Sequence, residues 1–439
     1  MADELARAVS PARLRVAVVG GGWAGLAAAV EACSLGHSVT LYEMAAIPGG
    51  RARCVPIDDL GFPVDNGQHI LIGAYTQTLR LMRQVGVDPE QVLQRLPLTL
   101  LDAQGRGLRL PTGAALPAFV RGVLAAHGWS IGERLALLRA AGGWLARRFR
   151  CAPQLTVAEL CAGLPPTVRR QLIDPLCVAA LNTPADQASA GVFLRVLRDA
   201  LFAGPGASDL LLPRVDLGTL WPEPAWRWLE ARGAALLRGR RVESIERGHS
   251  EWDVDGVAHD RVVLACPAGE AARLASPHAP DWATRAGRIR HEPIVTVLLR
   301  TEGLRLPAPM LALDPDDAAP AQYVFDLAQL RDREPGAAGV FAFVISGAAR
   351  AVERGLDATT TAVLAQARTQ LATLHPGAHW RPLRSLAEKR ATFLCIPRLR
   401  RPSAAVAPGL LAAGDYIDGP YPATLEGAVR SGIAAAHLL

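Results

Sequence analysis

The pattern of apolar positions at the start of the chain predicts a strand, a turn and a helix. Residues 14–19 (LRVAVV) form a short β-branched run of the kind that is buried in a parallel sheet. Three consecutive glycines then lead into an Ala- and Leu-rich stretch that predicts a helix up to Leu35. A second short strand is predicted at 38–42, and it ends at Glu43. This order is typical of the opening of an α/β sheet.

The glycines of the first turn have the spacing of a dinucleotide-binding motif. Gly20 allows the tight turn, Gly22 lets a pyrophosphate approach the backbone at the helix N-terminus, and Gly25 lets the helix pack closely on the strand. Glu43 follows at the distance where an acid accepts hydrogen bonds from an adenosine ribose. The alternative is a glycine turn of purely structural use. Because strand, helix and acid are all present, dinucleotide binding is the favoured interpretation.

Helical and strand periodicities alternate along the rest of the chain. Helices are predicted at 76–85, 116–126, 131–149, 166–181 and 188–201. Strands are predicted at 260–265, 295–300, 340–345 and 410–413, and a hairpin is predicted from 241–247 and 252–257. The length of 439 residues predicts about three structural units, with two large ones equally plausible.

The predicted helix at 131–149 is basic and amphipathic. It places Leu135, Leu138, Leu145 and Phe149 near one face, with Trp144 at the boundary. The arginines around the other face are Arg134, Arg139, Arg147, Arg148 and Arg150. Such a helix could lie on an anionic membrane surface, although a core helix with a solvated arginine face is the commoner explanation.

Composition narrows the class of protein. Half of the 439 residues are hydrophobic and 20% are charged, which excludes a disordered or fibrous chain. The formal net charge of +6 is spread along the chain without the basic tracts and interleaved aromatics of a nucleic-acid groove, so we expect no nucleic-acid partner. This mild basicity is compatible with an anionic membrane surface.

Cysteine usage and the absence of a targeting pattern indicate a cytoplasmic protein, at most peripheral at the inner membrane. The seven cysteines are odd in number and contain no C-x-x-C pair, which argues against a disulfide framework and a structural zinc site. Pro376 and Gly377 break any helix that would align His375 with His379, so no metal site is expected. The first residues lack the pattern of a secretory signal, and no uninterrupted apolar run is long enough for a spanning helix.

Further motifs at both ends of the chain carry a family resemblance. A second glycine pair followed by a guanidinium, GGRA (Gly49, Gly50, Arg51, Ala52), comes shortly after Glu43, and its glycines and the guanidinium, which suits phosphate or carbonyl oxygens, are expected to bind the cofactor. Near the C-terminus, Gly414 and Asp415 follow a short strand, and a helix is predicted from about Thr424. Together with the opening motif, these residues resemble the flavin amine oxidase and phytoene desaturase superfamily, whose cofactor is FAD.

The resemblance implies roles for several of these residues. Gly414 and Asp415 would bind the ribityl and pyrophosphate region of FAD, and the helix starting at Thr424 would point its positive end at the flavin pyrimidine. Val242 would contact the adenine side through its backbone. The alternative for the C-terminal segment is a capped helix that packs on a sheet.

Four internal blocks resemble one branch of this superfamily, the squalene-associated FAD-dependent desaturases, better described as the hydroxysqualene dehydroxylases of hopanoid biosynthesis. The blocks are residues 65–75, 174–184, 210–234 and 414–432. The resemblance implies an α/β fold, with a Rossmann-like FAD-binding domain of the GR2, amine-oxidase-like type and a mixed α+β, largely helical substrate domain. The FAD-binding domain is expected to comprise residues 13–75, 208–280 and 383–439, and the substrate domain residues 76–207 and 281–382.

The resemblance also implies a reaction, the reduction of hydroxysqualene to squalene by reduced FAD with loss of water, and therefore an electron donor that reduces FAD. The departing hydroxyl needs a proton in an otherwise apolar cavity. Asp65 and His69 are candidates near the flavin, although both could simply bond loop backbone. Cys177 and Asp174 are one turn apart on a predicted helix and are expected to share a face, although a free cysteine is more often a small core residue.

Three other functions stay open on the same motifs. The nearest rivals are oxidising enzymes of the superfamily, either a carotenoid-type desaturase or an amine oxidase. An amine oxidase is disfavoured because the sequence lacks an obvious aromatic cage. A prenyl-lipid carrier of this fold without flavin is a rival of a different class, against which Glu43, the GGRA motif and the C-terminal Gly-Asp pair argue.

Overall fold

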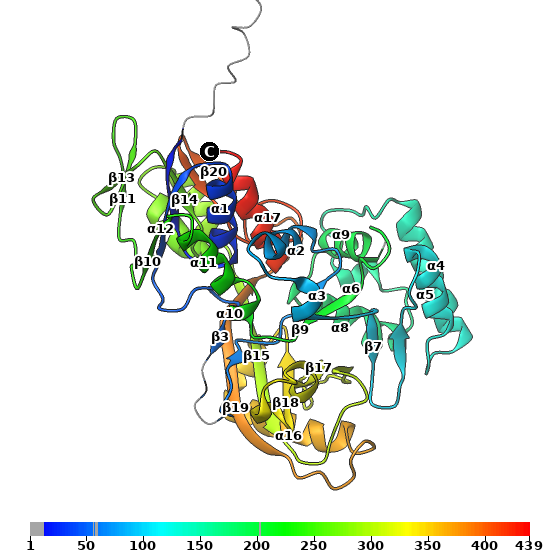
Figure 1. The fold of residues 1–439 in the computed structure, drawn as a ribbon. Coiled ribbons are helices and arrows are strands. Elements are labelled where there is room, and N and C mark those ends of the chain that lie inside the picture. The colour runs from blue at the N-terminus through cyan, green and yellow to red at the C-terminus, as the bar shows by residue number, and fades with distance from the viewer. Residues whose placement is uncertain (1–12, 56, 58–59, 202) are drawn as a thin grey trace, which may run out of the picture.

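Strands from both ends and from the middle of the chain meet in one six-stranded sheet (Figure 1). The computed structural model describes residues 13–55, 57, 60–201 and 203–439. The first twelve residues, where no secretory signal is expected, lie outside the described part. In spatial order the strands are β10 (Ala235–Arg238), β2 (Ser38–Glu43), β1 (Arg15–Val19), β14 (Arg261–Leu264), β21 (Leu410–Ala412) and β20 (Ala405–Ala407).

Neighbouring strands in this sheet run parallel, except for β20, which is antiparallel to β21. The short apolar runs predicted as buried strands therefore form the centre of the sheet, where parallel strands are covered on both faces. The predicted strands at the N-terminus, at 260–265 and at 410–413 are confirmed.

Different elements cover the two faces of the six-stranded sheet. One face packs against α1 (Trp23–Ser34) and α11 (Pro222–Glu230), and α17 (Leu425–Ala436) packs in turn on α1. The other face packs against a small sheet and two helices. These are β11 (Ile245–Arg247), β12 (Trp252–Val254), β13 (Val257–His259), α12 (Ala268–Ala275) and α13 (Pro280–Gly287). The predicted hairpin is thus the first part of a three-stranded sheet, because β13 extends it.

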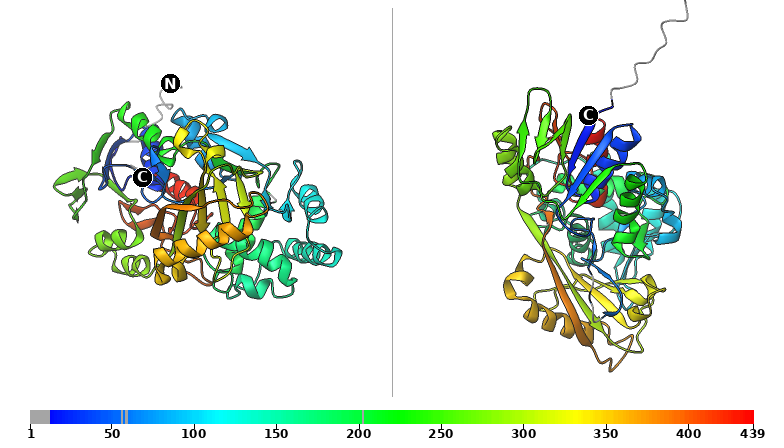
Figure 2. Two further views of the ribbon diagram at one scale, coloured as in Figure 1. Left: turned by 90° about the horizontal axis from the view of Figure 1, so that it is seen from below. Right: turned by 60° about the vertical axis from the view of Figure 1, so that its left-hand side comes forward.

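A second, antiparallel sheet of five strands lies beyond the first (Figures 1 and 2). Its order is β16 (Met310–Ala312), β17 (Tyr323–Asp326), β18 (Val340–Ile345), β15 (His291–Arg300) and β19 (Arg381–Phe393). Figure 2 shows α16 (Leu356–Gln370) across one face, where Val363 and Ala367 pack with the odd-numbered residues 295–299 of β15. Side chains on the opposite face of this sheet belong to one hydrophobic cluster with side chains of α8 (Asp174–Leu181) and α9 (Ala190–Leu201).

Shorter elements connect the two large sheets. The strands are β3 (Cys54–Val55), β4 (Val64–Asp65), β5 (Leu71–Ile72), β6 (Leu93–Leu96), β7 (Thr99–Leu101), β8 (Gly107–Arg109) and β9 (Leu210–Pro213). The helices are α2 (Thr76–Gln84), α3 (Pro89–Val92), α4 (Ala115–Leu124), α5 (Ile131–Ala146), α6 (Val157–Leu160), α7 (Pro166–Val168), α10 (Leu217–Leu220), α14 (Leu327–Leu330) and α15 (Ala349–Arg354). A π-helical turn, Arg169–Ile173, joins α7 to α8, so the helix predicted at 166–181 is continuous but irregular.

The prediction of which face of the long basic helix is buried is wrong. Helix α5 ends at Ala146, and Arg148 and Phe149 adopt left-handed backbone angles that turn the chain away from the helix axis. Its buried positions are Leu137, Ala141 and Trp144, spaced four and three residues apart. The prediction placed the leucines on the buried face. In the structure the large Trp144 packs against the core, so a different face of the helix is buried.

The predicted division into two domains stays a prediction, although the sheets show where its segments lie. Residues 383–393, assigned from the sequence to FAD binding, lie in β19 of the five-stranded sheet. Among the described residues, no helix combines the length and the apolar run needed to cross a bilayer.

Candidate functional site

Two glycines of the first turn are in positions that no other residue could occupy without rearrangement. Gly20 has a φ of +114°, and a Cβ on it would lie 2.7 Å from the carbonyl oxygen of Ala265. A Cβ on Gly25 would lie 1.8 Å from the carbonyl oxygen of Gly20. The tight turn and the close packing of α1 on β1 therefore both require glycine, as the spacing predicts.

Gly22 differs from its neighbours because the space beside it is open. Its φ of −76° and ψ of −177° suit any residue, and the nearest atom to an added Cβ is the Cα of Gly50 at 3.8 Å. The amide of Gly49 donates to the carbonyl oxygen of Gly21 at 2.9 Å, so the two glycine motifs lie against each other. The open position at the N-terminus of α1 fits the phosphate group of a dinucleotide.

Glu43 is fixed at the carboxyl end of β2, beside the glycine turn. Its carboxylate accepts from the amide of Gly21 at 2.6 Å and from the amide of Ala45 at 2.7 Å, and the side chain is buried. These contacts hold the carboxylate of Glu43 at the carboxyl end of β2, where the sequence predicts it. Its bond to a ribose stays a prediction.

Arg51 and Asp415 bring the two ends of the chain together. Nη2 of Arg51 donates to Oδ1 of Asp415 at 2.5 Å, and Nη1 donates to the carbonyl oxygen of Ala391 at 2.9 Å. Burial opposes the charge of the guanidinium, but Asp415 and Glu388 outweigh it and raise the pKa of Arg51. The two residues expected to bind FAD separately thus form one polar unit next to Gly414.

The C-terminal helix begins where its sequence predicts. Oγ1 of Thr424 caps the helix by accepting from the amide of Gly427 at 3.0 Å, and it donates to the carbonyl oxygen of Tyr421 at 2.7 Å. Tyr421 and Ala423 adopt left-handed angles, with φ of +54° and +59°. Such strain in non-glycine residues is common in loops that hold a ligand.

Val242 lies in the loop before β11, and its side chain is buried. Its carbonyl oxygen accepts from Nη2 of Arg273 at 2.9 Å. A backbone contact with adenine at Val242 stays a prediction.

Asp65 forms a buried ion pair that the sequence does not reveal. Its Oδ2 accepts from Arg331, and its Oδ1 accepts from the amide of Leu217 at 2.8 Å. Arg331 also donates to the carbonyl oxygens of Pro213 and Val215. Burial outweighs these contacts and raises the pKa of Asp65 to about 6. Asp65 therefore joins three separated segments, and this structural contact occupies both of its oxygens.

His69 is held by its own loop. Its Nδ1 lies 3.0 Å from the carbonyl oxygen of Gly67, which can only accept, so Nδ1 carries the proton. Burial, and to a smaller extent Arg51, lowers the pKa of the imidazole. In the neutral form Nε2 is therefore an acceptor, which suits a base better than the predicted proton donor.

Cys177 and Asp174 lie one turn apart on α8, but their burial differs. Cys177 is fully buried and donates from Sγ to the carbonyl oxygen of Thr183 at 3.4 Å, whereas Asp174 is exposed in the first turn of α8. Three residues of helix rotate a side chain by about 60° from its neighbour, enough to cross from core to solvent. Burial raises the pKa of the Cys177 thiol.

Two hydroxyl groups missed by the sequence analysis lie on the five-stranded sheet. Thr296 and Tyr323 both pair with Val344, so all three side chains lie in one row on one face. Oγ1 of Thr296 is buried and has no hydrogen-bond partner among the described residues. Burial raises the pKa of Tyr323, which keeps its phenol protonated. No local motif marks either residue, because strand pairing alone brings them together.

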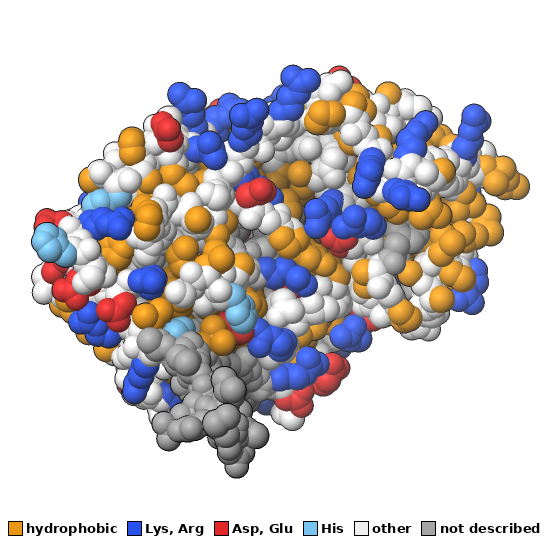
Figure 3. All heavy atoms as spheres, turned by 90° about the horizontal axis from the view of Figure 1, so that it is seen from above, with side chains coloured by type: hydrophobic (Ala, Val, Ile, Leu, Met, Phe, Trp, Pro, Cys, Tyr) orange, Lys and Arg blue, Asp and Glu red, His pale blue; other side chains and the backbone are white. Residues whose placement is uncertain are grey.

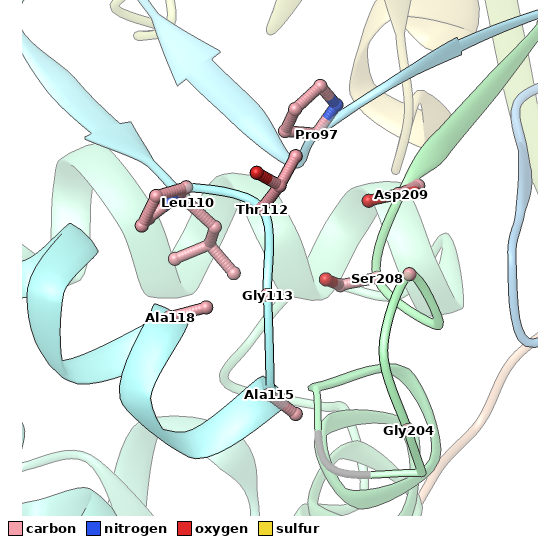
Figure 4. Close-up of a pocket in the computed structure, with 11 residues that line it drawn as sticks. Pro97, Leu110, Thr112, Gly113, Ala115, Ala118, Gly204, Ser208 and Asp209 are labelled. Atoms are coloured by element: carbon pink, nitrogen blue, oxygen red, sulfur yellow. The ribbon is translucent and has the colours of Figure 1, made fainter.

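A small hollow lies between α4 and the loop before β9 (Figure 4). Leu110, Gly113, Ala118, Gly204 and Asp209 are among the residues that line it, and its volume is about 50 Å³. Sites for drug-sized ligands have volumes of ~300–1,000 Å³, so this hollow is too small for a triterpenoid.

Comparison with protein families gives a match over nearly the whole chain. Residues 23–439 match the family described as flavin containing amine oxidoreductase. The hydroxysqualene dehydroxylase of Rhodopseudomonas palustris is 27% identical over 436 residues, covering 97% of this chain and 98% of that protein. The zeta-carotene desaturase of Zea mays is 34% identical over 116 residues, covering 25% of this chain and 20% of that protein.

Solved structures share the fold. An oxidoreductase from Methanosarcina mazei superposes with a TM-score of 0.70 at 16% identity, covering 97% of this chain and 100% of that one. The α/β fold with an amine-oxidase-like nucleotide-binding sheet is therefore confirmed.

Proposed function

Because the chain belongs to the flavin containing amine oxidoreductase family, we propose that it catalyses the reduction of hydroxysqualene to squalene. FAD is its cofactor, and the protein is an FAD-dependent oxidoreductase. The observation that carries the proposal is the extent of the similarity to hydroxysqualene dehydroxylases, which includes the five-stranded sheet and the helices beside it. The similarity to zeta-carotene desaturase covers only a quarter of the chain.

Hydrogen bonds connect the residues that would hold FAD, from Glu43 through Gly21 to Gly49 and from Arg51 to Asp415. The glycine turn with Gly22 accepts the pyrophosphate, Glu43 lies beside it for the ribose, and Arg51 with Asp415 lies next to Gly414. Helix α17 begins nearby at the capping residue Thr424, and its positive end would favour negative charge on the cofactor.

The substrate would lie against an apolar surface. The face of the five-stranded sheet opposite α16 presents Leu298, Phe325 and Ala342 to α8 and α9, within one hydrophobic cluster. Replacing C–OH by C–H requires a hydride, which reduced FAD supplies when bound, and a proton with which the hydroxyl leaves as water. The chain's own residues have to hold the apolar substrate, exclude water and provide that proton.

Cys177 is our candidate for the residue that donates this proton. The thiol belongs to that hydrophobic cluster and carries a proton at neutral pH, and burial raises its pKa, so it is a weaker acid than a free thiol. Tyr323 is the alternative, because its phenol is also protonated and lies on the apposed sheet face. Asp65 is bound to Arg331, Asp174 is exposed and neutral His69 presents an acceptor, so we place these three outside the proton transfer.

Anaerobic addition of hydroxysqualene to the photoreduced enzyme is expected to reoxidise the flavin and to form one squalene per FAD. The reason is that the proposed reaction consumes the reduced cofactor. Flavin absorbance and product extraction measure the two quantities together. A desaturase would behave in the opposite way: its oxidised flavin would be reduced by an apolar polyene, and reduced flavin would not respond to hydroxysqualene.

Cys177→Ala and Cys177→Ser are both expected to slow single-turnover flavin reoxidation by about 100-fold, because general acids contribute ~10²–10⁴-fold. FAD should stay bound, since Cys177 lies outside the glycine motifs. Stopped-flow absorbance with the photoreduced variants measures the rate.

Cys161→Ala is the matched control, because Cys161 is also a buried thiol of the same hydrophobic cluster. It is expected to stay within about tenfold of the wild type, since the lost volume affects packing only. A near-normal rate in Cys177→Ala would end the donor role of Cys177 and turn attention to Tyr323→Phe.

A further inference from the structure

Helices α4 and α5 expose two apolar stripes. On α5 the stripe follows positions 131, 135, 138 and 145, which lie on one side of a helix. On α4 it follows positions 116, 120 and 124. The exposed fractions are 47% for Leu116, 48% for Leu124, 73% for Ile131, 55% for Leu135 and 43% for Leu145. These seven positions are called the α4–α5 surface below.

The core uses little of this surface, since Leu138 alone of its seven positions packs against the buried cluster. Helix α5 buries Leu137, Ala141 and Trp144, and α4 buries Phe119 and Val123, on other sides of the two helices. Five of the eleven large apolar side chains that are exposed among the described residues lie on this one pair of helices. Isolated exposed leucines are ordinary, but their concentration on neighbouring helices marks an interaction surface.

The charge around the α4–α5 surface is strongly positive. Residues 111–150 contain six arginines and a single acid, Glu133, so they carry +5 of the formal net charge of +6. Glu133 is engaged in the capping box of α5 with Ser130, and Arg134 binds the carbonyl oxygen of Leu124. The other five, Arg121, Arg139, Arg147, Arg148 and Arg150, form no ion pair within the described part of the chain.

The charged and apolar groups lie at one end of the molecule. Figure 1 places α4 and α5 at the right-hand edge, away from α1 and α17. Figure 3, seen from above, shows orange apolar side chains gathered at that end with blue basic side chains around them. Unpaired arginines beside exposed leucines would be unfavourable against a second copy of the same basic surface.

We propose that the α4–α5 surface docks the protein on an anionic lipid bilayer. The apolar stripes would enter the boundary between headgroups and acyl chains, and the unpaired arginines would contact lipid phosphates. The combination of exposed apolar stripes and unpaired arginines fits an anionic membrane, because a bilayer offers negative headgroups directly above an apolar layer. The inference does not depend on the reaction that the enzyme catalyses.

Vesicle sedimentation of the FAD-loaded protein tests the proposal. The wild type is expected to bind vesicles of equal parts phosphatidylglycerol and phosphatidylcholine, and added salt should weaken the binding. Arg147→Glu with Arg148→Glu is expected to weaken it by at least tenfold, because two positive charges near the lipid become negative. Ile131→Ser with Leu135→Ser should also weaken it, through the apolar contact. All four side chains are exposed, so we expect both variants to fold.

The matched control places the same change of charge on another helix. Arg285 and Arg288 lie at the end of α13, are exposed and form no ion pair within the described residues, so Arg285→Glu with Arg288→Glu should bind vesicles like the wild type. If the two charge-reversal variants lost vesicle binding equally, the effect would be one of overall charge, and the proposal would be overturned. Undiminished binding of the α4–α5 variants would also overturn it, as would a wild-type dimer in sedimentation velocity that Leu135→Ser dissociates.

Discussion

Gly22→Val is expected to give a folded protein that retains almost no FAD. The backbone angles of Gly22 suit valine, and no protein atom lies closer than 3.8 Å to the new Cβ. The added methyl groups would instead fill the open position between Gly22 and Gly50, where the pyrophosphate has to approach the backbone. The flavin absorbance near ~450 nm relative to the protein absorbance measures the loss, and circular dichroism checks the fold.

Two glycine variants separate cofactor loss from misfolding. Gly269→Val adds the same side chain on α12, where no atom lies within 4 Å of a Cβ, and it should keep its FAD. Gly25→Ala places a Cβ 1.8 Å from a carbonyl oxygen, so it should destabilise the whole sheet. Stoichiometric FAD in folded Gly22→Val would show that the nucleotide binds elsewhere. A colourless wild-type protein would instead favour a carrier without flavin.

The nucleotide-binding half of the fold could be predicted because its constraints are local. A β-branched strand, three glycines and a helix specify the turn at Gly20 and Gly25 within twelve residues, and the contacts of these glycines agree with the motif. Thr424 likewise marks its own helix through a side-chain cap. Such signals need no knowledge of distant residues.

The remaining site depends on contacts between distant segments, which leave no pattern in the sequence. Arg51 and Asp415 were each predicted to contact FAD, but their mutual ion pair joins positions 364 residues apart. Thr296 and Tyr323 meet through strand register, and the burial of Trp144 decided which face of α5 is exposed. A periodicity measures how apolar a face is, whereas the partner that covers it is set by the tertiary fold.

Arg331→Met is expected to lower the free energy of unfolding by about 3–5 kcal/mol, because it leaves the buried carboxylate of Asp65 without its cation. The variant also frees the carbonyl oxygens of Pro213 and Val215, to which Arg331 donates. Three segments of the chain lose their common contact. Urea unfolding followed by circular dichroism measures the change, and Arg350→Met is the control. Arg350 and Asp317 form an ion pair with both side chains at least 80% exposed, so its loss should cost ~0–1 kcal/mol.

The dependence of this stability on pH follows from Asp65. Its pKa is about 6 in the folded protein, above the ordinary value of ~3.9, so proton binding favours the folded state. The contribution is complete below pH ~4 and is lost as the pH rises through about 6. Without Arg331 the pKa should rise further, so the deficit of Arg331→Met should be larger at pH 8 than at pH 5. A deficit of the same size at both pH values would contradict the assignment, and unfolding of Arg331→Met at the wild-type urea concentration would show that the pair does not hold these segments together.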